Sequence, residues 1–491
     1  MELHGEQPSE AHKTSTRRAF LSAGTAAAVA ATSAPLIAAP LIADPAYAGG
    51  SGKNGAAPGP GGPVHPQRPD RELRKLLSEV DRHRIEATVN RLVAFGTRHT
   101  SSTQTDPVRG IGAATTWVYN QLSAYAAASG GRMTVERQSF LQPVSPSIPV
   151  PTQMTNVIAT LRGDVSPERI YVATAHLDSR VTDVLNFTDD APGADDDGSG
   201  VAVLLELARL LATRHVKATI ILGIVVGEEQ GLYGSAFMAK QLKAAGAKIQ
   251  GMFSNDIVGA SSAFDGTPPD PHTLRLFVEG VPTSETPGQA ATRQSVGGEN
   301  DGPSRQLGRF VTSVADNDDT DMRIRVIWRR DRYLRGSDHV SFLQQGYPAA
   351  RFTEPRENYN HEHNDVAVVD GVQHGDLPQF CDFAYMTRVA KVNATTLWSL
   401  AQAPGTPANA RIVATTLTNL STLTWTRGTE PDLAGYEVLW RETTADDWTN
   451  VISVGDVTTA TIDLVKDNVC FGIRAVDTAG HRSPVASPQP S

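Results

Sequence analysis

The sequence predicts an α/β fold in which a mainly parallel, mixed central sheet is sandwiched by helices and followed by a small all-β sandwich domain. Between residues 169 and 254, apolar runs alternate with helical patterns, and this β-α-β order favours parallel strands covered on both faces. Beyond residue 407 the hydrophobic period changes to two, which is typical of short antiparallel strands. The chain has 491 residues, of which 40% are hydrophobic and 20% charged, so it is long enough for two or three soluble domains.

The first 48 residues are predicted to be a targeting segment. Residues 16–21 resemble a twin-arginine signal, and the Ala-Tyr-Ala at residues 46–48 fits a cleavage site. The Ala-rich stretch between them is interrupted by two prolines and an aspartate, which argues against a transmembrane anchor. We therefore expect export to the periplasm or the exterior of the cell, with no membrane span in the mature chain. Residues 49–69 are rich in Gly and Pro and predict a flexible linker.

The largest domain is expected over residues 70–402. Its clearest element is the run from Ala218 to Val226, which is almost unbroken in apolar residues and therefore predicts a buried parallel strand. The stretch 201–213 is apolar on most faces and predicts a buried helix. The other expected strands are 169–175, 249–254 and 349–353, and the other expected helices begin at residue 70 and occupy 110–129, 235–245 and 377–400.

A second domain is expected over residues 403–491, after a proline-bounded hinge at 404–407. Short alternating segments there predict a β-sandwich, and the segments around Trp425, Tyr436 and 474–480 resemble a fibronectin type III domain. Val469 occupies the position of the usual tyrosine corner, so we expect that corner's hydrogen bond to be missing. This domain is expected to bind a surface, a polymer or the first domain itself.

Charge and cysteine content exclude several classes of protein. The net charge is -9 and no basic patch stands out, so we expect no nucleic-acid partner. Cys381 and Cys470 are the only cysteines, and they lie far apart in the sequence. We therefore expect neither a disulfide nor a zinc site built from thiolates.

Glu228 and Glu229 stand side by side where the predicted 218–226 strand ends. Two adjacent carboxylates repel each other, and a positive charge placed between or in front of them removes that repulsion. A metal ion with a bound water supplies such a charge, so this pair points to a metal site.

Five segments place His, Asp or Glu at predicted strand ends or at the start of a helix. In an open α/β sheet these positions meet at one edge, where binding sites form. Imidazole and carboxylate ligands without thiolate suit catalytic zinc. For any single segment an ordinary loop is the favoured interpretation, and the set as a whole favours zinc because its members share one placement. The segments are 176–178, 193–200, 228–229, 255–256 and 361–365.

Two alternatives concern single segments. Asp195, Asp197 and Glu206 fit the spacing of an EF-hand calcium loop, but Pro192 precedes them and no incoming helix is predicted. His339 is a further candidate ligand, as is His363, and hydrogen bonding within a loop accounts for either equally well.

Together these stretches resemble the co-catalytic di-zinc aminopeptidases, the exopeptidase family that includes aminopeptidase Y and the secreted bacterial leucine aminopeptidases. The resemblance spans about 190 residues of the chain and is specific only as a group of motifs. The stretches that carry it are 175–179, 193–200, 227–235, 255–259, 337–339 and 361–365.

The resemblance implies two Zn²⁺ ions per chain and a role for each matching residue. Asp196 would bridge the two ions, with Asp195 and Asp197 as rival candidates, and a cis peptide would follow the bridging residue at Asp196–Asp197. Asp178 would orient a histidine ligand. The implied ligands are His176 and Asp256 for one zinc, and Glu229 and His361 for the other.

The last ligand position leaves two candidates. The family usually has Thr after its ligand histidine, whereas Glu362 follows His361 here. Both His361 and His363 are therefore possible ligands, and the four-residue spacing back from Asp365 favours His361.

The implied activity is removal of N-terminal residues from peptides by a secreted zinc aminopeptidase. Two zinc ions would lower the pKa of a shared water, and Glu228 would act as general base for it and return the proton to the leaving amine. The same scaffold also resembles carboxypeptidases and glutaminyl cyclases. A metal-stabilised adhesion protein without activity is a further alternative, although such a protein would be expected to have lost Glu228.

Overall fold

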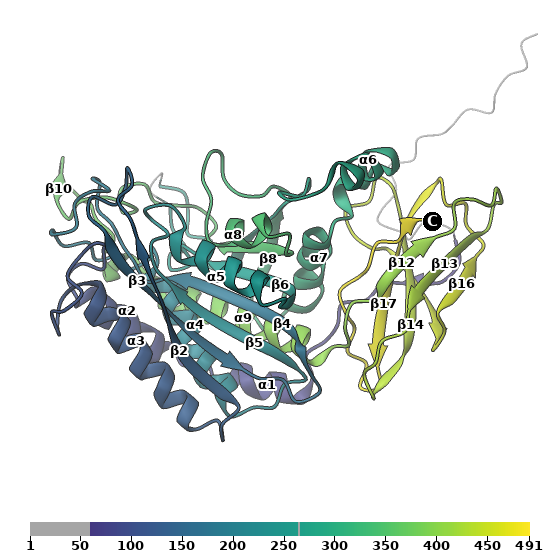
Figure 1. The fold of residues 1–491 in the computed structure, drawn as a ribbon, viewed down its shortest axis with the longest axis horizontal. Coiled ribbons are helices and arrows are strands. Elements are labelled where there is room, and N and C mark those ends of the chain that lie inside the picture. Colours follow the sequence, from purple (N-terminus) through teal and green to yellow (C-terminus); the bar gives the residue numbers. More distant parts are fainter. Residues whose placement is uncertain (1–58, 264–265) are drawn as a thin grey trace, which may run out of the picture. The chain divides into compact units, whose positions relative to one another are not determined.

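The structure is a computed structural model that describes residues 59–263 and 266–491. The predicted signal peptide and residues 49–58 of the predicted linker lie outside the described residues. Within them, no helix combines the length and the apolar character that crossing a bilayer requires. The largest element is an eight-stranded mixed sheet in the order β2-β3-β5-β4-β6-β9-β7-β8 (Figure 1). This architecture confirms the predicted fold class.

The centre of this sheet is parallel. It consists of β4 (Ser166–His176), β5 (Ala218–Val225), β6 (Lys248–Asn255) and β9 (Ala349–Thr353). Every residue of β5 is buried, because helices cover both faces of the strand. All four strands were predicted within one to three residues of their observed bounds, and their carboxyl ends meet at one edge.

Alternate residues of β5 enter two separate hydrophobic cores. Ile220, Leu222 and Ile224 pack against the cluster that holds α1 to α4, α7 and α9. Ile221 and Val225 pack against the cluster that holds α5 and α8. The helix bounds are Arg71–Ser78 (α1), Arg82–Val93 (α2), Gly110–Ala127 (α3), Gly198–Ala212 (α4), Tyr233–Ala244 (α5), Pro303–Ala315 (α7), His339–Gln344 (α8) and Phe383–Gln402 (α9).

The outer strands of the sheet are not predicted from the sequence. On one side β2 (Met133–Gln142) pairs antiparallel with β3 (Thr152–Leu161), which pairs antiparallel with β5. On the other side β7 (Thr273–Val278) is antiparallel to β9 and parallel to β8 (Arg323–Ile327). The smaller elements are α6 (Pro287–Val296), η1 (Gly298–Asn300), η2 (Pro378–Phe380) and a hairpin of β10 (Val368–Val369) with β11 (Val372–Gln373).

The C-terminal residues, together with the short strand β1, form two four-stranded sheets, and the C-terminal strands are the yellow-green arrows of Figure 1. Leu423, Trp425, Val438, Trp440 and Ile473 lie in one buried cluster between them. One sheet has the order β1 (Gly62–Pro63), β15 (Asn450–Gly455), β14 (Leu433–Glu442) and β17 (Val469–Asp477), and the other β16 (Thr459–Ile462), β13 (Ser421–Thr426), β12 (Ala408–Ile412) and β18 (Gln489–Pro490).

The strand β1 comes from the segment that the sequence predicts to be a linker. Pro63 lies opposite Asn450 in an antiparallel pair, and the indole Nε1 of Trp440 donates to the carbonyl of Pro60 at 2.8 Å. Residues 60–63 are therefore part of the C-terminal sheet.

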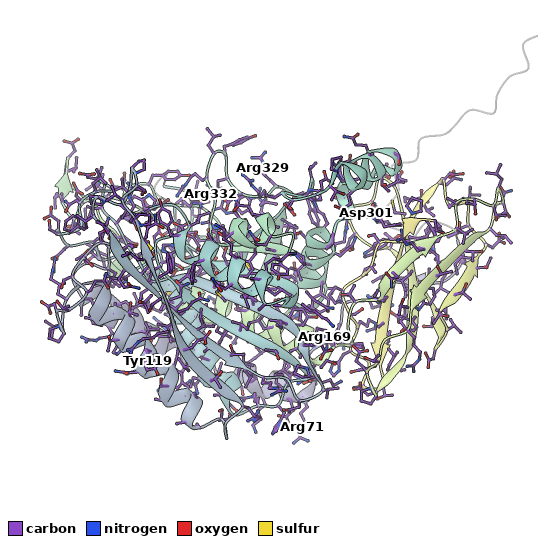
Figure 2. The ribbon with its side chains drawn as sticks, viewed as in Figure 1. Arg71, Tyr119, Arg169, Asp301, Arg329 and Arg332 are labelled. Carbon is purple, nitrogen blue, oxygen red and sulfur yellow. The ribbon has the colours of Figure 1, made fainter. Side chains whose placement is uncertain are left out.

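Ion pairs join these C-terminal strands to the rest of the described chain. Lys217 Nζ lies 2.7 Å from Asp477 Oδ2, and Arg441 lies 2.7 Å from Asp301, which is labelled in Figure 2. His481 lies between two carboxylates, 2.8 Å from Asp477 and 3.2 Å from Asp70. These contacts fix α1 and the start of β5 against the C-terminal residues.

Candidate metal centre

Three parallel strands deliver acidic or imidazole side chains to the same edge of the sheet. β4 ends at His176, and Asp256 follows β6 directly. After β5 the chain turns at Gly227, whose φ of 76° is the left-handed conformation that glycine adopts without strain. That turn places Glu228 and Glu229 beside the end of β4. The loop before α4 contributes Asp196, so the structure brings together four of the five predicted ligands.

Asp196 lies between two histidines and directs one carboxylate oxygen to each. Its Oδ1 is 3.0 Å from His176 Nε2, and its Oδ2 is 2.9 Å from His363 Nε2. His176 Nε2 is also 3.9 Å from Asp256 Oδ1, and His363 Nε2 is 2.9 Å from Glu229 Oε2. These side chains form two groups of potential metal ligands, and Asp196 belongs to both. The first group is His176, Asp196 and Asp256, and the second is Asp196, Glu229 and His363.

The structure places His363, and not the expected His361, in the second group of potential metal ligands. The ring of His361 stacks on Phe380 with the ring centroids 3.6 Å apart, and burial together with His374 lowers its pKa to about 4. The intervening turn reverses the chain, since His363 has a φ of 55°, so that the later histidine meets Asp196 and Glu229. The spacing from Asp365 favoured His361 because that spacing carries no information about this turn.

The residues present fit a pair of divalent cations. Two imidazoles and three carboxylates face one another, and Glu229 Oε1 is a buried atom without a hydrogen-bond partner among the described residues. Burial alone would lower the pKa of His363, but the carboxylates of Glu229 and Asp196 raise it to about 11. Burial, reinforced by Asp256 and Glu229, raises the pKa of Glu228 well above its usual range. This donor chemistry, with imidazole and carboxylate but no thiolate, suits zinc.

Asp178 supports the centre in a different way from the one expected. The Nδ1 atom of His176 lies 3.0 Å from the backbone carbonyl of Asp178 and 3.7 Å from its carboxylate. The carboxylate instead accepts the backbone N–H groups of Glu228 at 3.3 Å and of Glu229 at 3.1 Å. Asp178 therefore orients His176 through its main chain and fixes the two glutamates through its side chain.

The rival bridging candidates have other partners. Asp197 accepts the N–H of Gly200 at 3.0 Å, which caps α4, and the N–H of His176 at 2.9 Å. Asp195 accepts the N–H of Gly259 at 2.7 Å. The peptide bond between Asp196 and Asp197 is cis, as the resemblance implied. Among the described residues, neither rival carboxylate belongs to a group of potential metal ligands.

Asp376 and Arg351 contact the centre and were not predicted. Asp376 accepts the N–H of Asp196 at 2.7 Å and that of Asp195 at 2.8 Å, and it lies in a loop without any local sequence signal. Arg351 lies 3.1 Å from Asp256 Oδ1. A signal for Arg351 existed, since it is the one charged residue in an otherwise apolar predicted strand. Although burial raises it, the pKa of Asp256 is held below its usual range by Arg351 and His176.

His339, the other histidine considered as a ligand, lies outside both groups. Its Nε2 is 2.8 Å from the carbonyl of Arg330, and its Nδ1 is 3.4 Å from the hydroxyl of Ser254. The segment 179–192, which separates His176 from Asp196 in the sequence, contacts the loop that carries His363, because Thr182 donates its N–H to Asp365 at 3.2 Å.

The loop that contains Arg332 and Arg335 lies beside the candidate metal centre, on the side of His363. Arg332, labelled in Figure 2, and Arg335 each lie 2.9 Å from Glu357 Oε2. Arg335 also pairs with Glu362, the residue before His363. These pairs hold the loop that carries His363 against the loop that precedes α8.

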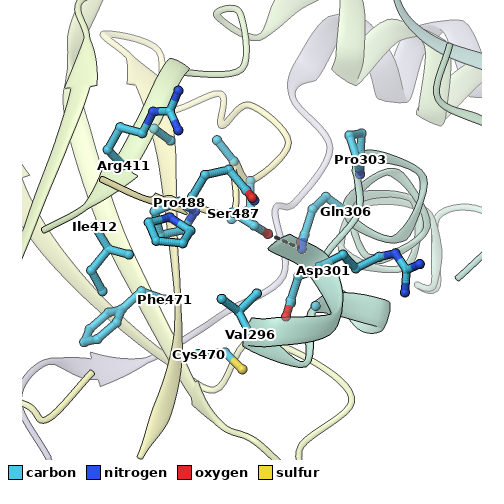
Figure 3. A pocket seen from close by; sticks show the side chains of 18 of the residues that line it. Val296, Asp301, Pro303, Gln306, Arg411, Ile412, Cys470, Phe471, Ser487 and Pro488 are labelled. Carbon is cyan, nitrogen blue, oxygen red and sulfur yellow. Dashed lines mark hydrogen bonds between the residues drawn. The ribbon is translucent and has the colours of Figure 1, made fainter. Parts of the chain in front are cut away.

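A large cavity lies away from this centre. Its volume is about 1270 Å³, and its lining comes from the region of α6 and α7 and from the C-terminal strands (Figure 3). Gln306 donates to Ser487 across it at 2.9 Å, while Ile412 and Phe471 contribute apolar surface. None of the residues of the two ligand groups lines it.

Comparisons with known proteins agree with this geometry. The model of peptidase family M28 matches residues 156–370, which include all the potential ligands described above. A probable zinc metalloprotease of Pyrenophora teres f. teres is 51% identical over 428 residues, covering 87% of this chain and 88% of the relative. A probable zinc metalloprotease of Pyricularia oryzae is 51% identical over 433 residues, covering 87% of this chain and 86% of the relative.

Solved structures are similar at lower identity. The LapA aminopeptidase of Legionella pneumophila is 18% identical with a TM-score of 0.48, covering 67% of this chain and 75% of that one. The glutaminyl cyclase of Porphyromonas gingivalis is 21% identical with a TM-score of 0.43, covering 65% of this chain and 97% of that one.

Proposed function

The chain belongs to the zinc metalloproteases of peptidase family M28, and from this membership we propose that it is a di-zinc aminopeptidase. The observation that carries the proposal is the position of Asp196, whose two oxygens face His176 and His363 separately. One carboxylate shared between two complete ligand groups is the arrangement that a two-metal hydrolytic site needs.

Each residue of the centre has a role in this proposal. His176 and Asp256 would hold one zinc, Glu229 and His363 would hold the other, and Asp196 is placed to serve both groups. Zinc ions at such a site would lower the pKa of a water molecule and polarise the carbonyl of the scissile bond. Glu228 would accept a proton from the attacking water and give it to the leaving amine.

The placement of Glu228 supports its role as the base. Its backbone N–H is fixed by the carboxylate of Asp178, which also fixes Glu229, so the base and the adjacent ligand keep one relative position. Because Glu229 is committed to a metal, Glu228 remains the free carboxylate next to it.

Substrate class is tested with the purified chain. We expect about two zinc ions per molecule by elemental analysis and release of free amino acid from an aminoacyl anilide. A chelator should abolish the release and added zinc should restore it. The matched N-acetylated anilide should not be cleaved, because an aminopeptidase requires a free α-amine. Cleavage of the acetylated substrate, or hydrolysis only from the carboxyl end of a peptide, would reject the aminopeptidase.

Three alternatives remain, of which two use the same metal site as enzymes and one has no enzymatic activity. A carboxypeptidase or a glutaminyl cyclase would use the same ligands, and cyclisation of an N-terminal glutamine in a peptide would identify the latter. A metal-stabilised adhesion protein would bind zinc without hydrolysing any of these substrates. The retention of Glu228 beside a complete ligand set favours an enzyme.

We also propose export and a separate role for the C-terminal residues. The twin-arginine-like pattern at residues 16–21 supports export, and fractionation of cells that make the tagged chain tests it. The two C-terminal sheets support a fibronectin type III-like module over residues 403–491 that binds a surface or polymer. Retention of the chain on insoluble polymers, compared with a chain that ends near residue 402, tests that role.

A further inference from the structure

Arg351 is a buried arginine within β9, and it contacts one of the proposed metal ligands. Its Nη2 lies 3.1 Å from Asp256 Oδ1 and donates to the backbone carbonyl of Asp256 at 3.1 Å. The side chain of Arg351 is 0% exposed. One oxygen of Asp256 therefore already faces a fixed positive charge in a region that water does not screen.

The other side of the Arg351 guanidinium faces the carboxylate of Asp331, which Arg351 shares with a second arginine. Its Nη1 lies 3.0 Å from Asp331 Oδ1, and the same oxygen lies 3.0 Å from Nε of Arg332. Because two guanidinium groups share Asp331, this carboxylate does not neutralise Arg351 completely. The remaining positive charge acts on Asp256.

Within residues 59–263 and 266–491, no ion pair joins an arginine to Glu229 or His363, and the nearby Arg335 pairs with Glu362 instead. The ion pairs of His363 within the described residues join it to Glu229 and to Asp196. The Oε1 atom of Glu229 is buried there without a hydrogen-bond partner. One oxygen of Glu229 is therefore available to a cation, whereas Oδ1 of Asp256 already faces Arg351.

We propose that Arg351 competes with the metal for Asp256. This competition gives the two metal positions unequal affinities, and the position formed by His176 and Asp256 binds zinc more weakly. The inference rests on the proposed two-metal site. Without metal, Arg351 balances the charge of Asp256, so an arriving cation gains less free energy there than at the position of Glu229 and His363.

The experiment is a titration of the metal-free full chain with Zn²⁺ in competition with a chromogenic chelator of known affinity. We expect two steps of different affinity. Arg351→Met removes the charge but keeps an unbranched side chain, and it should tighten the weaker step by about tenfold or more while leaving the stronger step in place. Arg351→Lys keeps the charge and should stay close to the unmodified chain.

A second variant changes the same charge in the opposite direction. Asp331→Asn leaves Arg351 in place but removes part of its counter-charge, so it should weaken the weaker step. Arg441→Met is the matched control, because Arg441 is a buried arginine that pairs with Asp301 away from the centre. This control should leave both steps unchanged.

Several outcomes would overturn the inference. Two equal steps in the unmodified chain would do so while leaving the aminopeptidase proposal intact, and absence of zinc binding would reject both. A folded Arg351→Met chain whose weaker step is unchanged or weaker still would show that Arg351 only orients Asp256. If Arg351→Met fails to fold, an Asp331→Asn chain with an unchanged weaker step would overturn the inference instead.

Discussion

The carboxylate of Asp376 accepts a hydrogen bond from the backbone N–H of Asp196 at 2.7 Å, across 180 residues of sequence. The same carboxylate accepts the N–H of Asp195, so it fixes the backbone on both sides of the bond that leads into the shared ligand. The position of Asp196 between the two histidines therefore depends on a residue outside every motif that the sequence displays.

Replacing Asp376 by Asn should weaken zinc binding. An amide presents one oxygen instead of two and turns an N–H₂ group toward the backbone N–H groups of Asp195 and Asp196. We expect a loss of about tenfold or more in affinity for zinc, as is usual when a residue that supports a ligand is removed. Asp382→Asn is the matched control, since Asp382 caps α9 and should affect thermal unfolding alone. Equal zinc affinities in the two variants would contradict the role of Asp376.

Glu228→Gln should separate metal binding from chemistry. Glutamine has nearly the same shape but cannot accept a proton, so zinc content should stay at the unmodified level. The turnover number should fall by about a hundredfold or more, the usual contribution of a general base. Glu229→Gln should instead lower the zinc content. Full turnover in the Glu228→Gln chain would remove the base from the mechanism.

His361 and His363 provide a matched pair of substitutions two residues apart. His363→Ala removes a ring nitrogen that lies 2.9 Å from both Asp196 and Glu229, so we expect this chain to retain about one zinc instead of two. His361→Ala removes a ring that stacks on Phe380 and should keep both ions. Elemental analysis after gel filtration measures the difference. The opposite pattern would restore His361 as the ligand.

His481 should make stability depend on pH. Its hydrogen bonds to Asp477 and Asp70 raise its pKa from 6.5 to about 9. Because the folded-state pKa is the higher one, the stabilisation is complete below the unfolded-state pKa and is lost as the pH rises through about 9. The shift corresponds to at most about 3 kcal/mol, and the partial exposure of Asp70 reduces it.

The measurement compares the unmodified chain with His481→Gln in denaturant unfolding at equal zinc loading. The difference in free energy of unfolding should be largest near about pH 6 and should vanish near about pH 10. A difference that is independent of pH would mean that His481 contributes through packing and not through its charge.

The strands that deliver the ligands are predictable from the sequence because they are apolar on both faces. Apolar runs such as 218–226 are followed within one or two residues by polar side chains, and this change marks where the chain leaves the sheet. His176, Glu229 and Asp256 all lie at or next to the first of these polar positions. Their convergence at one edge then follows from the parallel order of the strands.

The sequence does not reveal features that depend on an irregular backbone conformation or on contacts between residues far apart in the chain. The strand β2 has mostly exposed or partly exposed residues, so it lacks the continuous apolar run of β5. The choice between His361 and His363 depends on one residue with a positive φ, which no periodicity encodes. Asp376 acts through hydrogen bonds to backbone 180 residues away, a contact without any local pattern.

The pairing of Pro63 with Asn450 has a consequence for the biosynthesis of the chain. The ribosome makes β1 long before β15, so the sheet that contains both stays unfinished until the intervening residues have been translated. Contacts between residues so distant in sequence form late in folding. A shortened chain that starts at about residue 66 would leave the outer edge of β15 bare, and a bare strand edge invites pairing with other chains. Expression plasmids that omit these residues as a dispensable leader should therefore yield aggregated protein.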